Sequence, residues 1–353
     1  MSEPSKPGKR VRLRSVILSG ALTLILLGAV LVSSITGQLQ IAATDVVGVL
    51  LGWLGLDTPL APTDPVVQAT LEVVRFPRIM MALAVGAALA VAGALMQAVF
   101  GNPLAEPGVV GVSSGAALGA STAIVFGIAA GGGGVALLAF LGGLGATLLV
   151  YAVARAGGRT EVVTLLLTGI AINAFAQAGL AFVLFLADTA SREQIVFWQL
   201  GSLAGSVWSE VLIVLPVLVL GTVVAVVLGS KLDLLSLGER NARHLGVDVE
   251  QLRIISIVLV ALLTGVAVAF AGIIAFVGLV VPHIIRMALG PAHKGLLVAS
   301  AIGGGALLAI ADLLTRTLVE GADLPIGMLT ALVGGPFFFG LLYQQRRRSG
   351  GWA

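Results

Sequence analysis

The sequence predicts an all-α polytopic membrane protein, and three observations lead to that fold class. Of its 353 residues, 58% are hydrophobic and 10% are charged, against roughly 25% charged in ordinary soluble domains. The mean hydropathy of +1.10 leaves too little polar surface to coat a water-soluble globule. Apolar stretches of about 20 residues, the length that a bilayer requires of a helix, recur along the whole chain.

Ten membrane-spanning helices are expected from these stretches, in one transmembrane domain that covers residues 1–353. The polar, basic segment 1–14 precedes the first span. We expect it to be a cytoplasmic tail of a retained first helix, because no clear small-x-small cleavage site follows that span. The spans fall at about 15–35, 78–100, 107–128, 134–154, 162–187, 209–229, 252–273, 275–289, 296–314 and 326–344.

The distribution of Lys and Arg predicts the orientation. An even number of spans puts both termini on one side of the membrane. Sixteen of the 20 Lys and Arg residues fall on the side that holds the termini, and cytoplasmic loops carry such an excess. Both termini are therefore expected in the cytoplasm. The four exceptions are Arg75, Arg78, Arg192 and Arg316.

Several classes of function lack their residues in this chain. There is no cysteine, which excludes disulfides and thiol chemistry. The three histidines, His244, His283 and His293, lack the spacing of a metal site, so no metal is expected. No H-E-x-x-H pattern occurs, and enzymatic activity is not expected. A secondary transporter remains a rival, although Asp312 is nearly alone as an ionisable residue deep in a span.

A weak inverted repeat relates two segments that lie five spans apart and therefore cross the membrane in opposite directions. Inverted repeats are common in transporters. Asn102-Pro103-Leu104 and Pro282-His283 occupy corresponding places and are predicted to break helices. With an offset of 179, the matches are Gly86, Ala90, Ala92, Gly93 and Pro103 on Gly265, Ala269, Ala271, Gly272 and Pro282.

The longest cytoplasmic loop between spans covers residues 230–252 and mixes leucines at helical spacing with charged residues. Glycines at Gly238 and Gly246 suggest two short helices joined by a turn. Two interpretations stay open at this point. The loop could lie at the lipid headgroups, or it could dock a soluble partner.

This loop, with LGERNARHLGV, resembles the coupling segment of the FecCD type of ABC importer permease, the iron-siderophore, haem and cobalamin family. Further stretches are similar to that family and follow its order over most of the chain from about residue 70 onward. They are RFPR (75–78), GAALAVAGALMQAVFGNPLAEPGVVGVSSGAALGA (86–120), FWQLGSLAG (197–205), GIIAFVGLVVPHIIR (272–286), ADLLTR (311–316) and LPIGMLTALVGGPFF (324–338).

The resemblance implies a type II ABC importer permease, a homodimer bound to two ATP-binding subunits through its coupling helices. No Walker-type G-x-x-x-x-G-K-[ST] occurs, so this chain should bind no cofactor of its own, and ATP and Mg²⁺ belong on the partner subunit. The residues expected at the ATPase contact are Gly238, Glu239, Arg240, Arg243, His244 and Gly246.

Three arginines on the outer side also take a role from the resemblance. Arg75, Arg78 and Arg316 match arginines that dock acidic residues of the extracytoplasmic solute-binding protein. Charges at the rim of a protein–protein interface act mainly on the rate of association and on the relative orientation of the two proteins. The alternative is local pairing within the chain, for example of Arg75 with Glu72.

The fifth span carries polar groups at depths where they are uncommon, near one helical face. They either hydrogen-bond neighbouring helices or line the translocation path, which the fifth and tenth spans are thought to form in the family. We expect the second, with the preceding loop beside a cytoplasmic gate. The residues are Glu161, Thr164, Thr168, Asn173 and Gln177.

The expected cargo also comes from resemblance alone. The segments 106–120 and 185–205 look most like those of haem permeases. A ferric siderophore is the alternative and cobalamin the third candidate. The chain is thus expected to be a multi-pass protein in the cytoplasmic membrane of a bacterium, with no nucleic-acid partner.

Overall fold

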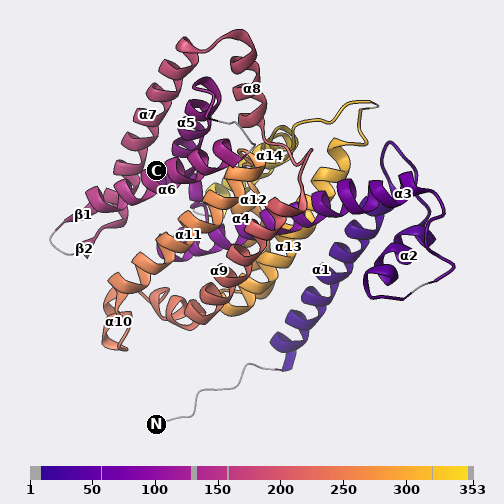
Figure 1. The fold of residues 1–353 in the computed structure, drawn as a ribbon. Helices are drawn as coiled ribbons and strands as arrows, with labels where there is room; N and C mark the ends of the chain where they lie inside the picture. The colour runs from indigo at the N-terminus through magenta and orange to yellow at the C-terminus, as the bar shows by residue number, and fades with distance from the viewer. Residues whose placement is uncertain (1–8, 57, 129–132, 157–158, 320, 349–353) are drawn as a thin grey trace.

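The computed structural model shows a helical protein (Figure 1). Within its described residues, strand pairing is confined to a short hairpin, in which β1 (Arg155–Ala156) runs antiparallel to β2 (Arg159–Thr160). The all-helical fold class is therefore confirmed. The structure describes residues 9–56, 58–128, 133–156, 159–319 and 321–348.

Seven helices of the described chain are long and apolar enough to cross a membrane. Three further predicted spans coincide with shorter apolar helical segments, namely α5 (Val112–Val125), α12 (Val277–Leu289) and the part Ile326–Leu341 of α14 (Ile326–Arg348). Every predicted span coincides with a helix, whereas ten complete crossings stay a prediction. The seven are α1 (Lys9–Ile35), α4 (Phe76–Val99) with the turns before it, α6 (Gly133–Ala154), α7 (Val162–Leu186), α9 (Trp208–Leu235), α11 (Val249–Ala271) and α13 (His293–Thr315).

Shorter helices occupy the connections. Asp188 caps α8, because its side chain accepts a hydrogen bond of 2.7 Å from the backbone N–H of Ser191. Hydrogen bonds from the backbone and side chain of Ser191 lower the pKa of the Asp188 carboxyl. The expected tail 1–14 needs one correction, because α1 already begins at Lys9. Residues 1–8 lie outside the described residues. The short helices are α2 (Ala43–Trp53), α3 (Pro65–Ala69), η2 (Pro107–Val110), α8 (Thr189–Leu200) and α10 (Glu239–His244).

Helix α4 forms the centre of the molecule and is buried along almost its whole length, against α9, α11, α12 and α13. Small residues let the backbones touch. A Cβ on Gly93 would lie 1.8 Å from the carbonyl oxygen of Gly278, and one on Gly86 would lie 2.2 Å from that of Gly304. In a membrane, such small residues let helices pack closely against one another.

A π-turn, η1 (Thr70–Arg75), joins α3 to α4 and makes one continuous helix from Pro65 to Val99. The residue Pro77 explains the wide turn. Proline has no N–H to donate to the carbonyl four residues back, and its ring clashes with that carbonyl. The N–H of Phe76 accordingly bonds the carbonyl of Leu71, five residues back.

The predicted helix break at Pro282 is wrong. Pro282 lies inside α12, whereas Pro103 lies in a turn after α4. The break falls earlier, at residues 272–276, where Gly272 (φ 70°) and Phe276 (φ 68°) take positive φ values. Segments related by the offset of 179 therefore differ in local structure. Pro282 lies past the first turn of α12, so its missing N–H leaves the carbonyl of Gly278 without an intrahelical donor.

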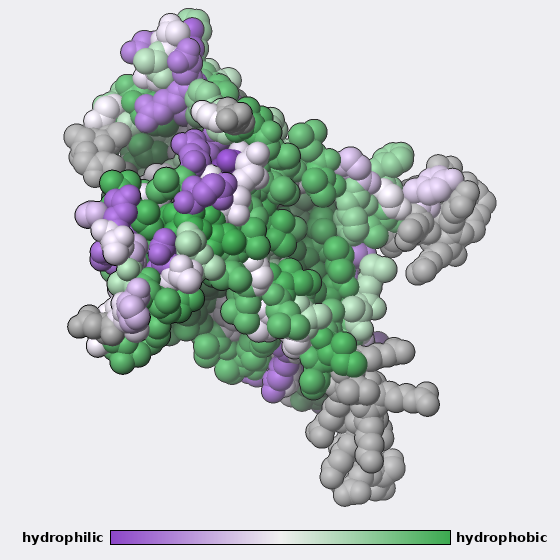
Figure 2. All heavy atoms as spheres, turned by 90° about the vertical axis from the view of Figure 1, so that its right-hand side faces the viewer, coloured by the Kyte–Doolittle hydropathy of each residue, from purple (hydrophilic) through white to green (hydrophobic). Residues whose placement is uncertain are grey.

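The outer surface of the helices is apolar. Figure 2 shows a largely hydrophobic face on which hydrophilic groups gather in patches towards one side. Helix α7 presents Phe175 and Phe185, which are 73% and 78% exposed. A surface of this kind is stable in lipid, where helices satisfy their own backbone groups. The protein is a multi-pass membrane protein.

Candidate functional site

The predicted functional residues fall at two ends of the molecule. Figure 1 shows α10 and the β1–β2 hairpin at the lower left, with α2 and α3 at the far right. The residues expected at the ATPase contact lie on and beside α10. The arginines expected to face the binding protein lie at the end of α4 next to α2 and α3. The two sets are thus held at opposite ends by the central helices.

The coupling loop contains one short helix where two were expected. Of residues 230–252, the first part continues α9 to Leu235 and the last part belongs to α11, which begins at Val249. Only α10, Glu239–His244, stands between them. The leucine spacing that suggested a second helix reflects the ends of the two long helices.

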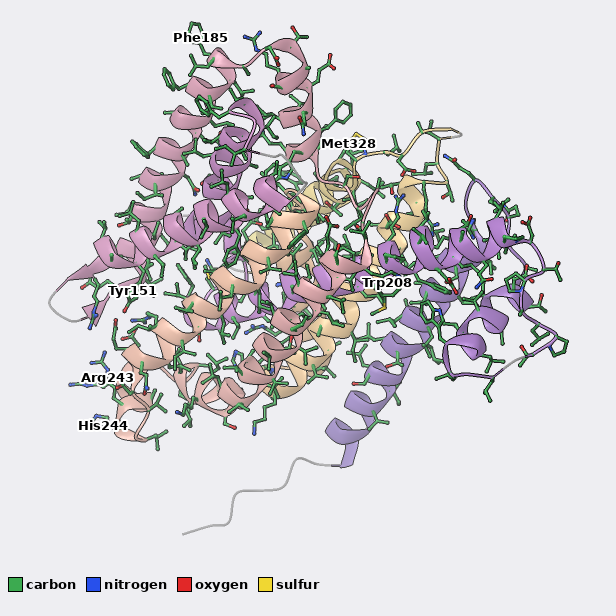
Figure 3. The ribbon with its side chains drawn as sticks, viewed as in Figure 1. Tyr151, Phe185, Trp208, Arg243, His244 and Met328 are labelled. Atoms are coloured by element: carbon green, nitrogen blue, oxygen red, sulfur yellow. The ribbon has the colours of Figure 1, made fainter. Side chains whose placement is uncertain are left out.

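Two glycines shape this loop, as the sequence predicted. Gly238 begins α10 at φ 100° and Gly246 follows it at φ 83°, a region that favours glycine. The side chains of Arg243 and His244 project from the tip of the loop (Figure 3) and, like Arg240, are exposed. An exposed tip of mixed charge is suited to contact a soluble protein.

Glu239 has a second, structural role that the sequence did not indicate. Its Oε1 atom accepts a hydrogen bond of 2.5 Å from Nη2 of Arg253, a side chain that is 2% exposed. Its Oε2 atom lies 3.4 Å from Nη2 of Arg243. Glu239 therefore links α10 to the start of α11.

At the opposite end, Arg75 is buried, with 4% of its surface exposed. Its guanidinium donates to the carbonyl oxygens of Ser34 and Leu39, at and after the end of α1. Glu72, the partner suggested by the sequence, instead accepts from the indole N–H of Trp53 at 3.3 Å. Arg75 thus satisfies carbonyls at a helix C-terminus, where positive charge is favourable.

Arg78 bridges two acids. Its Nε atom lies 2.8 Å from Oδ1 of Asp312, and its Nη1 atom lies 2.7 Å from Oδ2 of Asp323. Asp312 is only 1% exposed, so this pair is a buried salt bridge. The partner of Asp312, which the sequence could not name, is therefore Arg78.

Arg316 completes the cluster. It donates to the carbonyl oxygen of Ser33 at 2.6 Å, and its Nε atom lies 3.8 Å from Oδ2 of Asp312. Arg75, Arg78 and Arg316 all have acceptors within the chain, as in the alternative of local pairing. The structure shows α1, α4 and α13 joined by these contacts. Docking of a binding protein through the same arginines stays a prediction.

The polar residues of the fifth span, α7, have different surroundings. Asn173 accepts from the hydroxyl of Ser114 and donates to the carbonyl of Gly108 at 3.3 Å, so it ties α7 to the start of α5. Gln177 is exposed, and Thr164 and Thr168 are half-buried. Glu161 is exposed beside the β1–β2 hairpin and accepts from Thr164 at 3.4 Å. Asn173 thus hydrogen-bonds a neighbouring helix, the first of the two alternatives. For Glu161, Thr164, Thr168 and Gln177, a place along the translocation path stays a prediction.

The helical bundle, with an exposed charged loop at one end and a buried arginine cluster at the other, defines a multi-pass membrane transport protein. Residues 24–344 match the FecCD transport family. The chain therefore belongs to the FecCD transport family of ABC importer permeases.

Curated relatives agree with this assignment. The chain is 42% identical to the hemin transport system permease protein HmuU of Yersinia pestis over 290 residues, which cover 79% of this chain and 84% of HmuU. It is 41% identical to the cobalamin import system permease protein BtuC of Halobacterium salinarum, over 80% of this chain and 75% of BtuC. It is 37% identical to the Fe(3+)-citrate permease YfmD of Bacillus subtilis, over 79% and 82% of the two chains.

A solved structure has the same fold. It is an inward-facing conformation of a transporter assigned to the metal-chelate ABC type, with a TM-score of 0.80 and 33% identity. The match covers 92% of this chain and 98% of that one. The similarity therefore extends over most of the chain.

Proposed function

We propose that this chain is the permease subunit of an importer that moves haem across the cytoplasmic membrane. The observation that carries the choice of haem is the 42% identity to a hemin permease over 79% of the chain. The segments 106–120 and 185–205 support the same cargo. A ferric chelate is the alternative, favoured by the relation to a Fe(3+)-citrate permease. Cobalamin is the third candidate, because a cobalamin permease is nearly as similar.

The proposed assembly follows from the family and the exposed surfaces. Two copies of the chain would form the pathway, as membership of the permease family suggests. Each copy would bind an ATP-binding subunit at α10, because the permease carries no P-loop of its own. A solute-binding protein would deliver the cargo at the end next to α2 and α3.

Transport by the reconstituted assembly tests the cargo. Vesicles that contain the permease, its ATP-binding subunit and the cognate binding protein are given haemin, a ferric siderophore or cobalamin. We expect ATP-dependent uptake of haemin to exceed that of the other two by about tenfold, a difference of about 1.4 kcal/mol in recognition. Equal or greater uptake of another chelate would replace haem as the cargo. Uptake without ATP would reject the importer class and favour a secondary transporter.

The tip of the coupling loop can be tested separately. The double substitution Arg243→Ala and His244→Ala removes two exposed side chains of α10. Both side chains are exposed, so the permease should fold and purify normally. The amount of ATP-binding subunit that co-purifies with it should fall roughly tenfold, as expected when a strong interface contact is lost. Co-purification measures this. Arg192→Ala, an exposed arginine on α8, is the matched control and should leave binding unchanged. Wild-type retention by the double variant would contradict the assigned contact.

A further inference from the structure

A cavity of about 330 Å³ lies beneath the coupling loop, where the ends of α4, α9 and α12 meet the starts of α11 and α13. Residues of the loop itself, including Gly238, form part of its wall. The cavity is therefore next to the segment that bears the predicted ATPase contact. Its polar lining consists of Gln97, Ser236, Glu239, Arg253, Arg286 and His293.

One cation in this cavity lacks a counter-charge. The Nε and Nη2 atoms of Arg286 are buried and have no hydrogen-bond partner in the described part of the chain, and no described acid forms a salt bridge with it. Glu239, the acid in the cavity wall, is engaged by Arg253. Asp233 also has a partner. Its Oδ1 atom lies 2.7 Å from Nδ1 of His293 and accepts a hydrogen bond of 2.8 Å from the backbone N–H of His293.

An arginine cannot escape this situation by losing its proton, because a guanidinium stays protonated in proteins. Burial of two unpaired donors is costly, so the Nε and Nη2 edge of the half-buried Arg286 requires an anion or ordered water. Its two vacant atoms, Nε and Nη2, share one edge of the guanidinium. That edge is the fork that binds two oxygens of one oxyanion side by side.

Two further buried groups in the wall lack partners. His293 is 1% exposed, and its Nε2 atom has no hydrogen-bond partner among the described residues. Gln97 is also 1% exposed; its amide N–H donates to Leu279 at 3.2 Å, while its Oε1 atom has no donor there. Oε1 needs a hydroxyl or N–H group, which a protonated phosphate or a phospholipid headgroup possesses and a halide does not. Three incomplete polar side chains in one cavity indicate a bound group.

We propose that this cavity binds a phosphate group, with Arg286 holding two of its oxygens. The volume is far larger than a halide needs, and basic pockets between helices at the cytoplasmic side of membrane proteins bind phospholipid headgroups. The group comes either from an anionic phospholipid or from free phosphate. Binding itself does not depend on the proposed transport of haem. Its position would make occupancy affect the packing of α10 against α9 and α11.

Thermal unfolding of the purified full-length chain tests this site in two arms. One arm compares sodium phosphate with sodium chloride at equal ionic strength in detergent. The other compares lipid discs that contain phosphatidylglycerol with discs of phosphatidylcholine alone. A ligand that binds only the folded state raises the melting temperature, and we expect a saturable rise of about 3 °C in at least one arm. A rise only with phosphatidylglycerol identifies the headgroup, and a rise only with phosphate identifies the free ion.

Variants decide whether the effect belongs to Arg286. Arg286→Met should abolish the rise, whereas Arg155→Met, an exposed arginine at the same end of the molecule, should retain it. Ser236→Glu places a carboxylate at the exposed rim of the cavity and should diminish the rise even if Arg286→Met does not fold. The absence of any rise in the wild-type chain overturns the proposal. So does a full rise in Arg286→Met, or in Ser236→Glu if the first variant is unstable.

Discussion

Gly93→Ala is expected to destabilise the protein by about 3 kcal/mol or more, at the upper end of the effects of overpacking. The added Cβ would lie 1.8 Å from the carbonyl oxygen of Gly278 and 2.4 Å from its carbonyl carbon. Both obstacles are backbone atoms, so α12 itself would have to move away from the central helix. Thermal unfolding in detergent and the yield of monodisperse protein measure the effect.

Gly145→Ala on α6 is the matched control for this prediction. A Cβ at Gly145 meets no atom within 4 Å. Alanine is better than glycine within a helix by roughly 0.5–1 kcal/mol, so this variant should be unchanged or slightly more stable. The two substitutions are chemically identical and have opposite expected signs. Equal stability of the two variants would contradict the close approach of α4 and α12.

Asp312→Asn is expected to cost about 3 kcal/mol of stability, because removal of one partner from a buried ion pair leaves an uncompensated charge. The substitution keeps the shape of the side chain but removes the negative charge beside Arg78 and Arg316. The contacts of both arginines join α4, α13 and the end of α1. We therefore expect a lower unfolding temperature together with earlier proteolysis near the start of α2.

Asp323→Asn distinguishes the effect of burying an ion pair from the effect of its charge alone. Asp323 bonds the same arginine, Arg78, at nearly the same distance as Asp312 but is 32% exposed. Exposed pairs contribute about 0–1 kcal/mol, so this variant should lose no more than that. A double-mutant cycle of Arg78→Gln with Asp312→Asn gives the coupling energy directly. If both aspartate variants lose the same stability, burial does not determine the strength of the cluster.

The helices could be predicted from the sequence because hydropathy is a local property. Each apolar stretch coincides with a helix, and Gly238 and Gly246 marked the limits of α10 correctly. Such features depend on residues close in the chain, as does the capping of α8 by Asp188. The predicted helix pair in the coupling loop failed for a related reason. Leucines at the ends of α9 and α11 have the same spacing as those of a separate helix, and periodicity alone does not locate a boundary.

The contacts that define the two ends could not be predicted. Arg78 and Asp312 are 234 positions apart, and no local pattern couples them. The resemblance to the permease family suggested that the outer arginines dock a partner protein. The structure shows that they have acceptors on distant helices, on α1 for Arg75 and Arg316 and on α13 for Arg78. The break expected at Pro282 lies instead at residues 272–276, where Gly272 packs against the backbone of Trp198, a contact that no local pattern reveals.

The π-turn before α4 fixes the number of residues between α3 and α4, although the hydropathy of this segment would permit a shorter or longer connection. A π-turn holds one residue more than a turn of α-helix. Deletion of one residue within Thr70–Arg75 would rotate α3 by about 100° relative to α4. Insertions in the preceding surface loop would leave this geometry intact. Natural variation in length should therefore accumulate before Pro65 and be absent from the six residues that follow Ala69.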